Sequence, residues 1–146
     1  MIALIQRVSE AAVQVDGEVI GAIGAGMLAL IAVQPDDAPG KADRLLEKML
    51  NYRVFPDDAD RMNRSLRDTG GGLLLVSQFT LAADTSKGTR ASFTSAASPE
   101  LAAQCFRHLV DTARRSHAVV ASGRFAADMK VSLVNDGPVT FWLEVR

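Results

Sequence analysis

The chain has 146 residues, of which 48% are hydrophobic and 23% charged, and its formal net charge is -1. These values indicate one globular domain over residues 1–146. The net charge argues against a protein that coats DNA or RNA electrostatically, because non-specific affinity comes from neutralised phosphates, but it leaves room for a local basic patch. No apolar run approaches the ~20 residues of a membrane span, no basic leader precedes a long apolar core, and the single Cys105 suits a reducing compartment. We therefore expect a cytoplasmic protein with neither DNA nor a membrane as partner.

The first quarter of the chain predicts three strands. Ala3–Val15 is rich in Val and Ile and partly alternating, which predicts a strand with a bulge near Ser9–Ala11. Asp16-Gly17 is a typical hairpin turn and leads into a second strand, Glu18–Ile23. Met27–Val33 is a continuous apolar run, as expected of a central strand that is buried on both faces.

The middle of the chain predicts two helices on either side of a further strand. From Lys41 the apolar period becomes that of an amphipathic helix, with its apolar face formed by Ala42, Leu45, Leu46, Met49 and Leu50. Leu73–Val76 follows three glycines and predicts a strand. A second helix begins with Ser98 as N-cap and Pro99 at its first position, and the polar stretch Ala82–Ala97 before it is a long loop.

The C-terminal segment predicts a β-hairpin. Its outgoing strand is Met129–Val134, with Met129, Val131 and Leu133 facing inward, and its return strand is Phe141–Val145. Trp142 points away from the apolar face of the return strand, so we expect it under a helix or in a subunit interface. The six or seven strands and two helices are grouped rather than strictly alternating, which indicates an α+β fold with helices packed on a mixed or antiparallel sheet.

Two short polar blocks stand beside these apolar strands. Ser77-Gln78-Phe79-Thr80 directly follows Leu73–Val76, and Asn135-Asp136-Gly137-Pro138-Val139-Thr140 separates the two predicted strands of the C-terminal hairpin. Hydroxyls, amides and free backbone groups at strand ends are typical of a polar pocket on a rigid sheet. The competing interpretations are a strand end that satisfies its own backbone and ordinary turn chemistry.

The other reactive side chains give little support for a metal site or for a nucleophile paired with a base. Cys105 lies on the apolar stripe of the second helix, and His108 and His117 are expected at its surface or edge. The hydroxyl nucleophiles available in the polar blocks are Ser77, Thr80 and Thr140. Each would need a base, and neither histidine lies in a block. We expect no metal and no cofactor, and an esterase built on these blocks would position its substrate and stabilise charge.

The two polar blocks resemble the two signature motifs of the D-aminoacyl-tRNA deacylases, homodimeric editing enzymes that clear D-amino acids from tRNA. The resemblance covers essentially the whole chain, from Met1–Val8 through Lys87–Phe93 and Gly123–Phe125 to the C-terminus. One departure is Ala91, where the family usually has proline. The resemblance implies a barrel-like sheet and a two-fold dimer.

The resemblance also implies a mechanism and its residues. The ester would be cleaved with help from the 2′-hydroxyl of the tRNA, in an oxyanion pocket around Phe79 and Thr80. A cis Gly137-Pro138 bond would enter the partner's pocket, where its carbonyls would hold the α-ammonium group and exclude L-amino acids by collision at Cα. Glycine lacks a Cβ, so glycyl-tRNA mischarged on tRNA-Ala would escape this filter.

The residues implied by the resemblance fall into three groups. The catalytic block is Ser77, Gln78, Phe79 and Thr80. The substrate-binding block is Asn135, Gly137, Pro138, Val139 and Thr140. Bracing of this second block, or contact with the 3′ end of the tRNA, is expected of Arg7, Lys87, Arg90, Phe125 and Met129.

Two other functions fit the same residues. A non-catalytic dimeric module that holds a small polar ligand or an RNA end would use the same pocket. A general esterase would use Thr80 or Ser77 as a nucleophile. Turnover of a D-aminoacyl-tRNA separates the first alternative from an editing hydrolase, and a trapped acyl-enzyme would favour the second.

Overall fold

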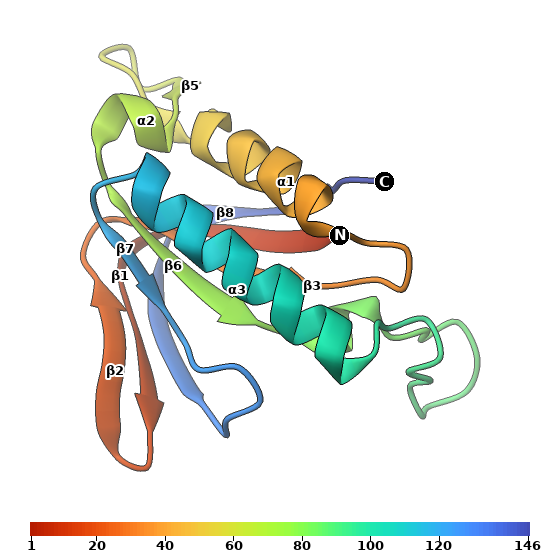
Figure 1. The fold of residues 1–146 in the computed structure, drawn as a ribbon. Coiled ribbons are helices and arrows are strands. Elements are labelled where there is room, and N and C mark those ends of the chain that lie inside the picture. Colours follow the sequence, from red (N-terminus) through yellow and green to blue (C-terminus); the bar gives the residue numbers. More distant parts are fainter.

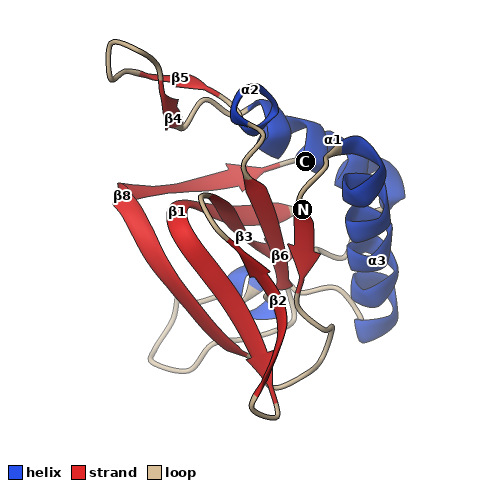
Figure 2. Ribbon diagram, turned by 90° about the vertical axis from the view of Figure 1, so that its left-hand side faces the viewer, coloured by secondary structure: helices blue, strands red, loops and turns tan.

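The computed structural model describes residues 1–146 and is organised around one long strand, β1 (Ile2–Val15). One edge of β1 pairs antiparallel first with β3 (Gly26–Ala32) and then with β2 (Glu18–Ile23), and the other edge pairs antiparallel with β8 (Lys130–Glu144). The sheet continues from β3 through two parallel strands, β6 (Gly72–Ser77) and β7 (Val120–Ser122). A separate two-stranded ribbon, β4 (Phe55–Pro56) and β5 (Met62–Arg64), stands away from this sheet (Figure 2).

Two helices cover one face of the sheet. Helix α1 (Pro39–Asn51) and helix α3 (Pro99–Ser116) lie side by side on that face in both ribbon views (Figures 1 and 2). Their apolar stripes meet β1, β3 and β6 in a core of 25 buried residues. The predicted N-cap is confirmed, because Ser98 Oγ accepts a hydrogen bond from Leu101 N at 3.3 Å. No helix is both long and apolar enough to cross a bilayer.

A third helix, α2 (Leu66–Thr69), is absent from the sequence prediction. It has four residues, too few to show an apolar period, but its ends carry strong local signals. Ser65 and Asp68 form a reciprocal capping box, and Gly70 ends the helix with a φ of 71°. Leu66 anchors this turn in the main core with no exposed surface.

The sheet curls until it nearly closes into a barrel. Its far half contains a second core of eight buried residues contributed by β1, β2, β3 and β6. At the closing edge, a Cβ added to Gly21 of β2 would lie 2.7 Å from the carbonyl oxygen of Ser122 in β7. Only glycine allows this approach of the two backbones. The predicted α+β fold with a barrel-like mixed sheet is confirmed, with three helices rather than two.

The predicted C-terminal hairpin is wrong. Residues 130–144 form a single strand that stays paired with β1 from Glu144 opposite Ile2 to Lys130 opposite Gln14. The turn-forming residues between Asn135 and Thr140 bulge out opposite Arg7 instead of reversing the chain. The irregular pairing of β1 between Val8 and Glu10 agrees with the bulge predicted there.

The inward alternation predicted for the first part of this strand holds only in part. Val131 is half-buried and packs against the second core, but Leu133 is 36% exposed and its neighbour Val134 is 50% exposed. This half of β8 has β1 as its only strand neighbour, because β8 lies at the edge of the sheet. Because an edge strand has a neighbouring strand on one side only, fewer side chains cover its apolar residues and they stay accessible.

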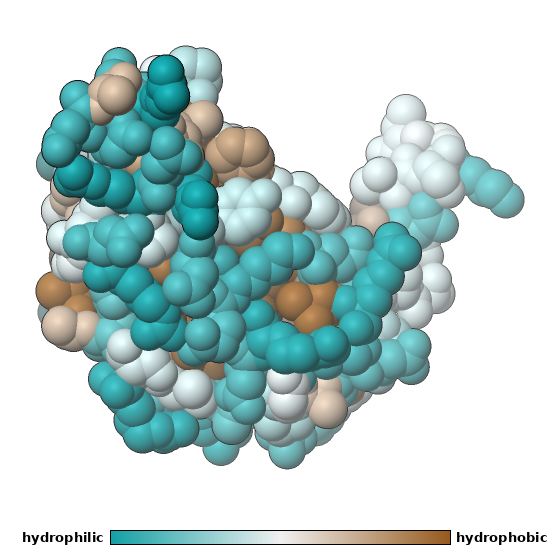
Figure 3. All heavy atoms as spheres, turned by 90° about the horizontal axis from the view of Figure 1, so that it is seen from above, coloured by the Kyte–Doolittle hydropathy of each residue, from teal (hydrophilic) through white to brown (hydrophobic).

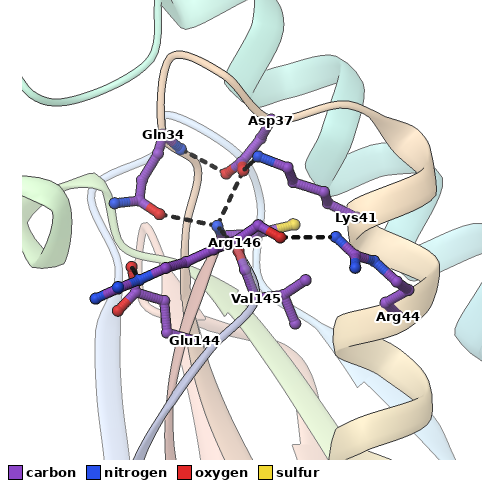
Figure 4. A network of polar contacts seen from close by, with 8 residues as sticks. Gln34, Asp37, Lys41, Arg44, Glu144, Val145 and Arg146 are labelled. Atoms are coloured by element: carbon purple, nitrogen blue, oxygen red, sulfur yellow. Dashed lines mark hydrogen bonds and ion pairs between the residues drawn. The ribbon is translucent and has the colours of Figure 1, made fainter.

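A buried polar network ties the first residue of the chain to its C-terminal end and to the segment after β3 (Figure 4). The α-ammonium group of Met1 donates to Gln34 Oε1 at 2.9 Å, to Asp37 Oδ1 at 2.9 Å and to the carbonyl oxygen of Val145 at 2.8 Å. Lys41 on the first turn of α1 lies 3.3 Å from the same Asp37 oxygen. A buried charge is stable only when it is paired, so the ammonium group of Met1 must stay close to Asp37 and to the carbonyl of Val145. The network thereby fixes the start of β1 beside the end of β8.

Candidate active site

A pocket of about 500 Å³ opens where β6 ends. Its walls are the end of β6, the first turn of α3 and the segment that leads from β7 to β8. Most of the wall is apolar, and the lining residues are Val76, Ser77, Gln78, Phe79, Ala97, Pro99, Ala102, Phe125, Ala126, Ala127, Asp128, Met129 and Val131. An apolar hollow with a few polar groups at one end is the usual form of a small-ligand site.

Three residues of the first polar block, Ser77, Gln78 and Phe79, line one end of this pocket, whereas Thr80 is not among the lining residues. Ser77 closes β6, and the main-chain N–H of Gln78 donates to Ile31 O at 2.7 Å, which extends the pairing with β3 by one residue. The chain then turns into a short 3-10 helix, η1 (Phe79–Ala82). As the first residues of η1, Phe79 and Thr80 present main-chain N–H groups that have no acceptor within the helix. Gln78 Nε2 donates to Thr80 Oγ1 at 2.5 Å.

The second polar block forms a projecting corner on β8. Asn135 holds it from inside, since its Nδ2 donates to Arg7 O at 2.9 Å and to Val139 O at 3.0 Å, and its Oδ1 accepts from Val139 N at 3.3 Å. Gly137 and Pro138, joined by a cis peptide bond, are exposed at the tip. Thr140 is exposed as well, whereas Val139 is buried in the main core.

Arg7 braces this corner from the neighbouring strand. Its Nε donates to Asp136 O and its Nη1 to Val54 O, both at 2.7 Å. The side chain is only 15% exposed and lies 3.4 Å from the Asp136 carboxylate. Arg7 thereby ties the bulge of β8 to the segment between α1 and β4. The planar guanidinium can satisfy two carbonyls in fixed directions, which lysine cannot do.

The two blocks do not meet within one chain. Ser77 lies opposite Ile31 of β3, and Ile31 lies opposite Ala3 of β1. The bulge lies at the level of Arg7, four residues further along β1 and on its other edge. Four residues along the strands and three strand spacings amount to roughly 20 Å in a sheet of ordinary dimensions. In agreement with this estimate, no residue of Asn135–Thr140 is among those that line the pocket of the same chain.

The remaining predicted site residues divide between the pocket and a projecting loop. Phe125 and Met129 line the pocket, and Phe125 also contacts Phe106 of α3, with ring centroids 6.3 Å apart. Lys87 and Arg90 are exposed in the loop between η1 and α3, which extends away from the body at the right of Figures 1 and 3. Neither of them reaches the pocket lining.

Sequence reasoning missed the small residues that create the hollow. Ala97, Ala102 and Ala127 leave the space that larger side chains would fill. Alanine carries no chemical signal, and only the way that α3 crosses the end of β6 makes these positions part of a pocket. Asp128, an exposed acid at the rim that lies 3.4 Å from Lys130, was missed as well.

No histidine or cysteine is placed to activate a hydroxyl in the pocket. His108 Nε2 lies 2.7 Å from Asp43 Oδ1 between α3 and α1, and His117 Nε2 lies 2.6 Å from Gly71 O. Cys105 is fully buried in the main core, and burial raises the pKa of its thiol. No three His, Cys, Asp or Glu side chains converge as metal ligands. The chemistry available at the pocket is therefore hydrogen bonding to a developing charge and positioning of an activated substrate.

Comparisons with known proteins identify the family of the chain. Residues 4–144 match the family model described as D-Tyr-tRNA(Tyr) deacylase. A D-aminoacyl-tRNA deacylase of Alkalilimnicola ehrlichii is 66% identical over 146 residues, which is 100% of this chain and 97% of the relative. A D-aminoacyl-tRNA deacylase of Thioalkalivibrio sulfidiphilus is 68% identical over 145 residues, 99% of this chain and 97% of the relative.

Two solved structures share the fold. A protein named c-Myc DNA Unwinding Element Binding Protein superposes with a TM-score of 0.95 at 36% identity, over 100% of this chain and 99% of that one. A probable eukaryotic D-amino acid tRNA deacylase has a TM-score of 0.83 over 99% of this chain and 98% of that one, and at 17% identity it supports the fold alone.

A barrel-like sheet with a polar strand end over an apolar pocket, matched along its whole length to deacylases, places the chain among the hydrolases that cleave the ester of an aminoacyl-tRNA. More narrowly, the chain belongs to the D-Tyr-tRNA(Tyr) deacylase family. The predicted family and enzyme class are confirmed. The roles of the individual site residues stay predictions.

Proposed function

We propose that this chain removes D-amino acids from tRNA in the cytoplasm by hydrolysing the ester at the 3′ end, and that it also acts on glycine mischarged on tRNA-Ala. Each active site would combine the pocket of one chain with the Gly137-Pro138 corner of the partner subunit. The observation that carries this proposal is the separation of the two polar blocks. One is the wall of a hollow and the other is a projection, and they lie roughly 20 Å apart on the same chain by strand spacing.

The uncovered face of the sheet supports association of two copies. The row Leu30, Leu4 and Trp142 crosses β3, β1 and β8 in register on the face opposite the main core, and it begins beside Val76 at the pocket. Leu30 and Leu4 are half-buried, Leu30 packs against the second core, and Trp142 is 51% exposed. A second copy related by a two-fold axis would cover this row and could bring each corner to the other pocket.

The chemistry would rely on the main chain and the substrate. The N–H groups at the start of η1 would hold the oxyanion that develops on the ester carbonyl, and each such donor can contribute ~2.7–4 kcal/mol. The neighbouring ribose 2′-hydroxyl would supply the assistance that no histidine or cysteine at the pocket provides. Thr80 Oγ1 already accepts a hydrogen bond from Gln78, so its role would be to shape the pocket.

Selection of the D-amino acid would also rest on the main chain. The corner is held by Arg7 and Asn135, so its tip can present carbonyls in fixed directions. Placed in the partner subunit's pocket, these carbonyls would bind the α-ammonium group and leave no room for a substituent on the L side of Cα. Glycine has no such substituent and would be accepted.

The direct test is hydrolysis by the purified protein of D-Tyr-tRNA, L-Tyr-tRNA and Gly-tRNA-Ala. We expect turnover of the first and third and none of the second. Binding of D-Tyr-tRNA without turnover would favour a non-catalytic module. Equal hydrolysis of the D and L esters would refute selection by the corner, and an acyl-enzyme on Thr80 or Ser77 would favour the general esterase.

The composite site has its own test in purified heterodimers. One chain carries Ala127→Trp, which fills the pocket, and the other carries Arg7→Ala, which loosens the corner. This heterodimer keeps one intact composite site, so it should retain about half of the wild-type activity. The matched control joins a wild-type chain to a chain that carries both changes and should be almost inactive. If each site lay within one chain, the two results would be reversed.

A further inference from the structure

Two phenylalanines outside the apolar cores form an exposed pair beside the pocket. Phe79 is 58% exposed and Phe93 is 48% exposed, and neither belongs to an apolar core cluster. Their ring centroids are 5.2 Å apart and the ring planes are inclined by 48°. Scattered single apolar residues are common on surfaces, but two adjacent aromatic rings at a functional site indicate a binding surface.

The pair lies where an extended ligand leaving the pocket would pass. Phe79 lines the pocket, and Phe93 continues from it into the projecting loop. The base of that loop is closed by two main-chain hydrogen bonds between Asp84 and Ser92, of 2.8 and 2.9 Å. Phe93 follows Ser92 directly, so its backbone starts from this fixed point.

The same loop carries cations without partners. Lys87 and Arg90 are exposed near its tip, and neither forms an ion pair or a hydrogen bond with another residue. The one acidic residue of the loop, Asp84, accepts a hydrogen bond from the main chain of Ser86 and does not pair with either cation. Hydrogen bonds from the side chain and the main-chain N–H of Ser86 hold its pKa below the ordinary value. The loop therefore offers two free positive charges next to an aromatic surface.

Aromatic rings combined with nearby cations are the arrangement that binds single-stranded nucleic acid, because bases stack on the rings while the cations meet the phosphates. We propose that Phe79 and Phe93 stack the base of the unpaired nucleotide that precedes the terminal nucleoside of the tRNA, and that Lys87 and Arg90 bind its phosphates. This inference rests on the proposed function and adds the residues that hold the RNA strand outside the pocket.

The test compares three D-tyrosyl esters that differ in the length of RNA: the ester of adenosine, the ester of the dinucleotide CpA, and D-Tyr-tRNA. For the wild-type protein we expect kcat/KM to rise by about 10-fold from the adenosine ester to the dinucleotide ester, through stacking of one base. Phe93→Leu should lose this gain, mainly through KM, while it hydrolyses the adenosine ester at the wild-type rate. Phe93→Trp keeps an aromatic surface and should retain the gain.

Removing the base of the penultimate nucleotide provides a matched change in the substrate. The abasic ester should lose the part of the gain that stacking supplies with the wild-type protein and lose nothing further with Phe93→Leu, because the two changes remove the same contact and keep the phosphate. The double variant of Lys87→Ala and Arg90→Ala should flatten the salt dependence on the dinucleotide ester and leave the adenosine ester unaffected.

Three results would overturn the inference. One is an equal loss by Phe93→Leu on all three esters, and another is no dependence of the wild-type rate on the added nucleotide. The third is dissociation of the protein into monomers by Phe93→Leu in sedimentation, which would show that a second copy covers the aromatic pair. If the wild-type protein hydrolyses none of the three esters, the proposed function fails instead, so the two failures are distinguishable.

Discussion

The two polar blocks are similar in composition but differ in shape, because one lines a hollow and the other projects from the sheet. Each is a short run of hydroxyl, amide or turn-forming residues that directly follows apolar strand residues. Ser77–Thr80 lies at the end of β6 and forms one side of a hollow whose other sides come from α3 and the segment before β8. Asn135–Thr140 interrupts β8 and projects from it, with Gly137 and Pro138 exposed at the tip.

The two blocks also differ in what holds them in place. The shape of the first depends on packing between distant elements and on small residues in helix α3 and the loops. The second is held by directional hydrogen bonds from two side chains, Arg7 and Asn135, and would keep its shape while facing solvent or another subunit. The hollow and the rigid projection are separate on one chain, and this separation is the reason why we propose a site that combines two chains.

The largest loss of activity is expected when the corner at Gly137 and Pro138 loses its hydrogen bonds from Arg7. Arg7→Ala removes the donors to Asp136 O and Val54 O, so the corner can shift by about an ångström, a displacement that can lower a rate by ~100-fold. The measurement is kcat/KM on D-Tyr-tRNA, with circular dichroism to verify the fold. Asp136→Ala is the matched control, because it removes only the exposed carboxylate and keeps the carbonyl that Arg7 binds. Equal losses in the two variants would mean that charge, rather than the position of the corner, is what Arg7 supplies.

The hollow should be more tolerant than the corner. Ala127→Leu adds bulk to the pocket wall and should lower kcat/KM by about 10-fold, as expected from the ~1–3 kcal/mol cost of overfilling a packed site. The loss should appear in KM, because Ala127 lies on the apolar wall and offers no group to the reaction. Ala118→Leu makes the same change on an exposed residue outside the pocket and should have no effect. A pocket that does not bind the substrate would show no difference between the two variants.

Thr80 tests whether the first block acts through its side chain. Thr80→Ala should lower the rate by less than about 10-fold, because the hydroxyl loses one hydrogen bond of ~1 kcal/mol with Gln78 and no base activates it. Replacement of the terminal 2′-hydroxyl of the tRNA by hydrogen should lower the rate far more, and Thr80→Ser should behave as the wild type. An inactive Thr80→Ala variant with normal cleavage of the 2′-deoxy substrate would assign catalysis to the threonine.

Salt concentration should have only a small effect on KM for the tRNA substrate. With a net charge of -1, we expect only ~2–4 phosphate contacts and a correspondingly shallow dependence of log KM on log salt concentration. Titration of KM between low and physiological salt measures the slope. A steep slope would indicate an extended nucleic-acid surface and contradict this prediction.

Chelation is expected to have no effect. No group of three potential ligands lies in either block or elsewhere in the chain, so excess EDTA should leave the single-turnover rate on the D-tyrosyl adenosine ester unchanged. This short substrate avoids effects of the chelator on tRNA folding. Loss of activity that zinc alone restores would show that a metal ion completes the site.

Local patterns in the sequence were enough to predict most of the elements. The apolar alternation of β1, the continuous apolar run of β3 and the helical period of α1 each reflect the surroundings of one element. Ser98 and Pro99 marked the start of α3 because capping is a property of adjacent residues. The two polar blocks could be recognised for the same reason, since each is continuous in sequence.

Only the tertiary structure decides that one polar block becomes a projecting corner and the other lines a pocket. Asn135–Thr140 has the composition of a turn, and on local grounds a hairpin was the natural prediction. Because both flanks of this segment pair with the same strand, β1, the chain continues and the turn residues become a corner. The pocket depends in the same way on Ala97, Ala102 and Ala127, whose small size matters only once α3 crosses the end of β6. Strand pairing and the space between packed elements join residues that are distant in sequence, so no local pattern contains them.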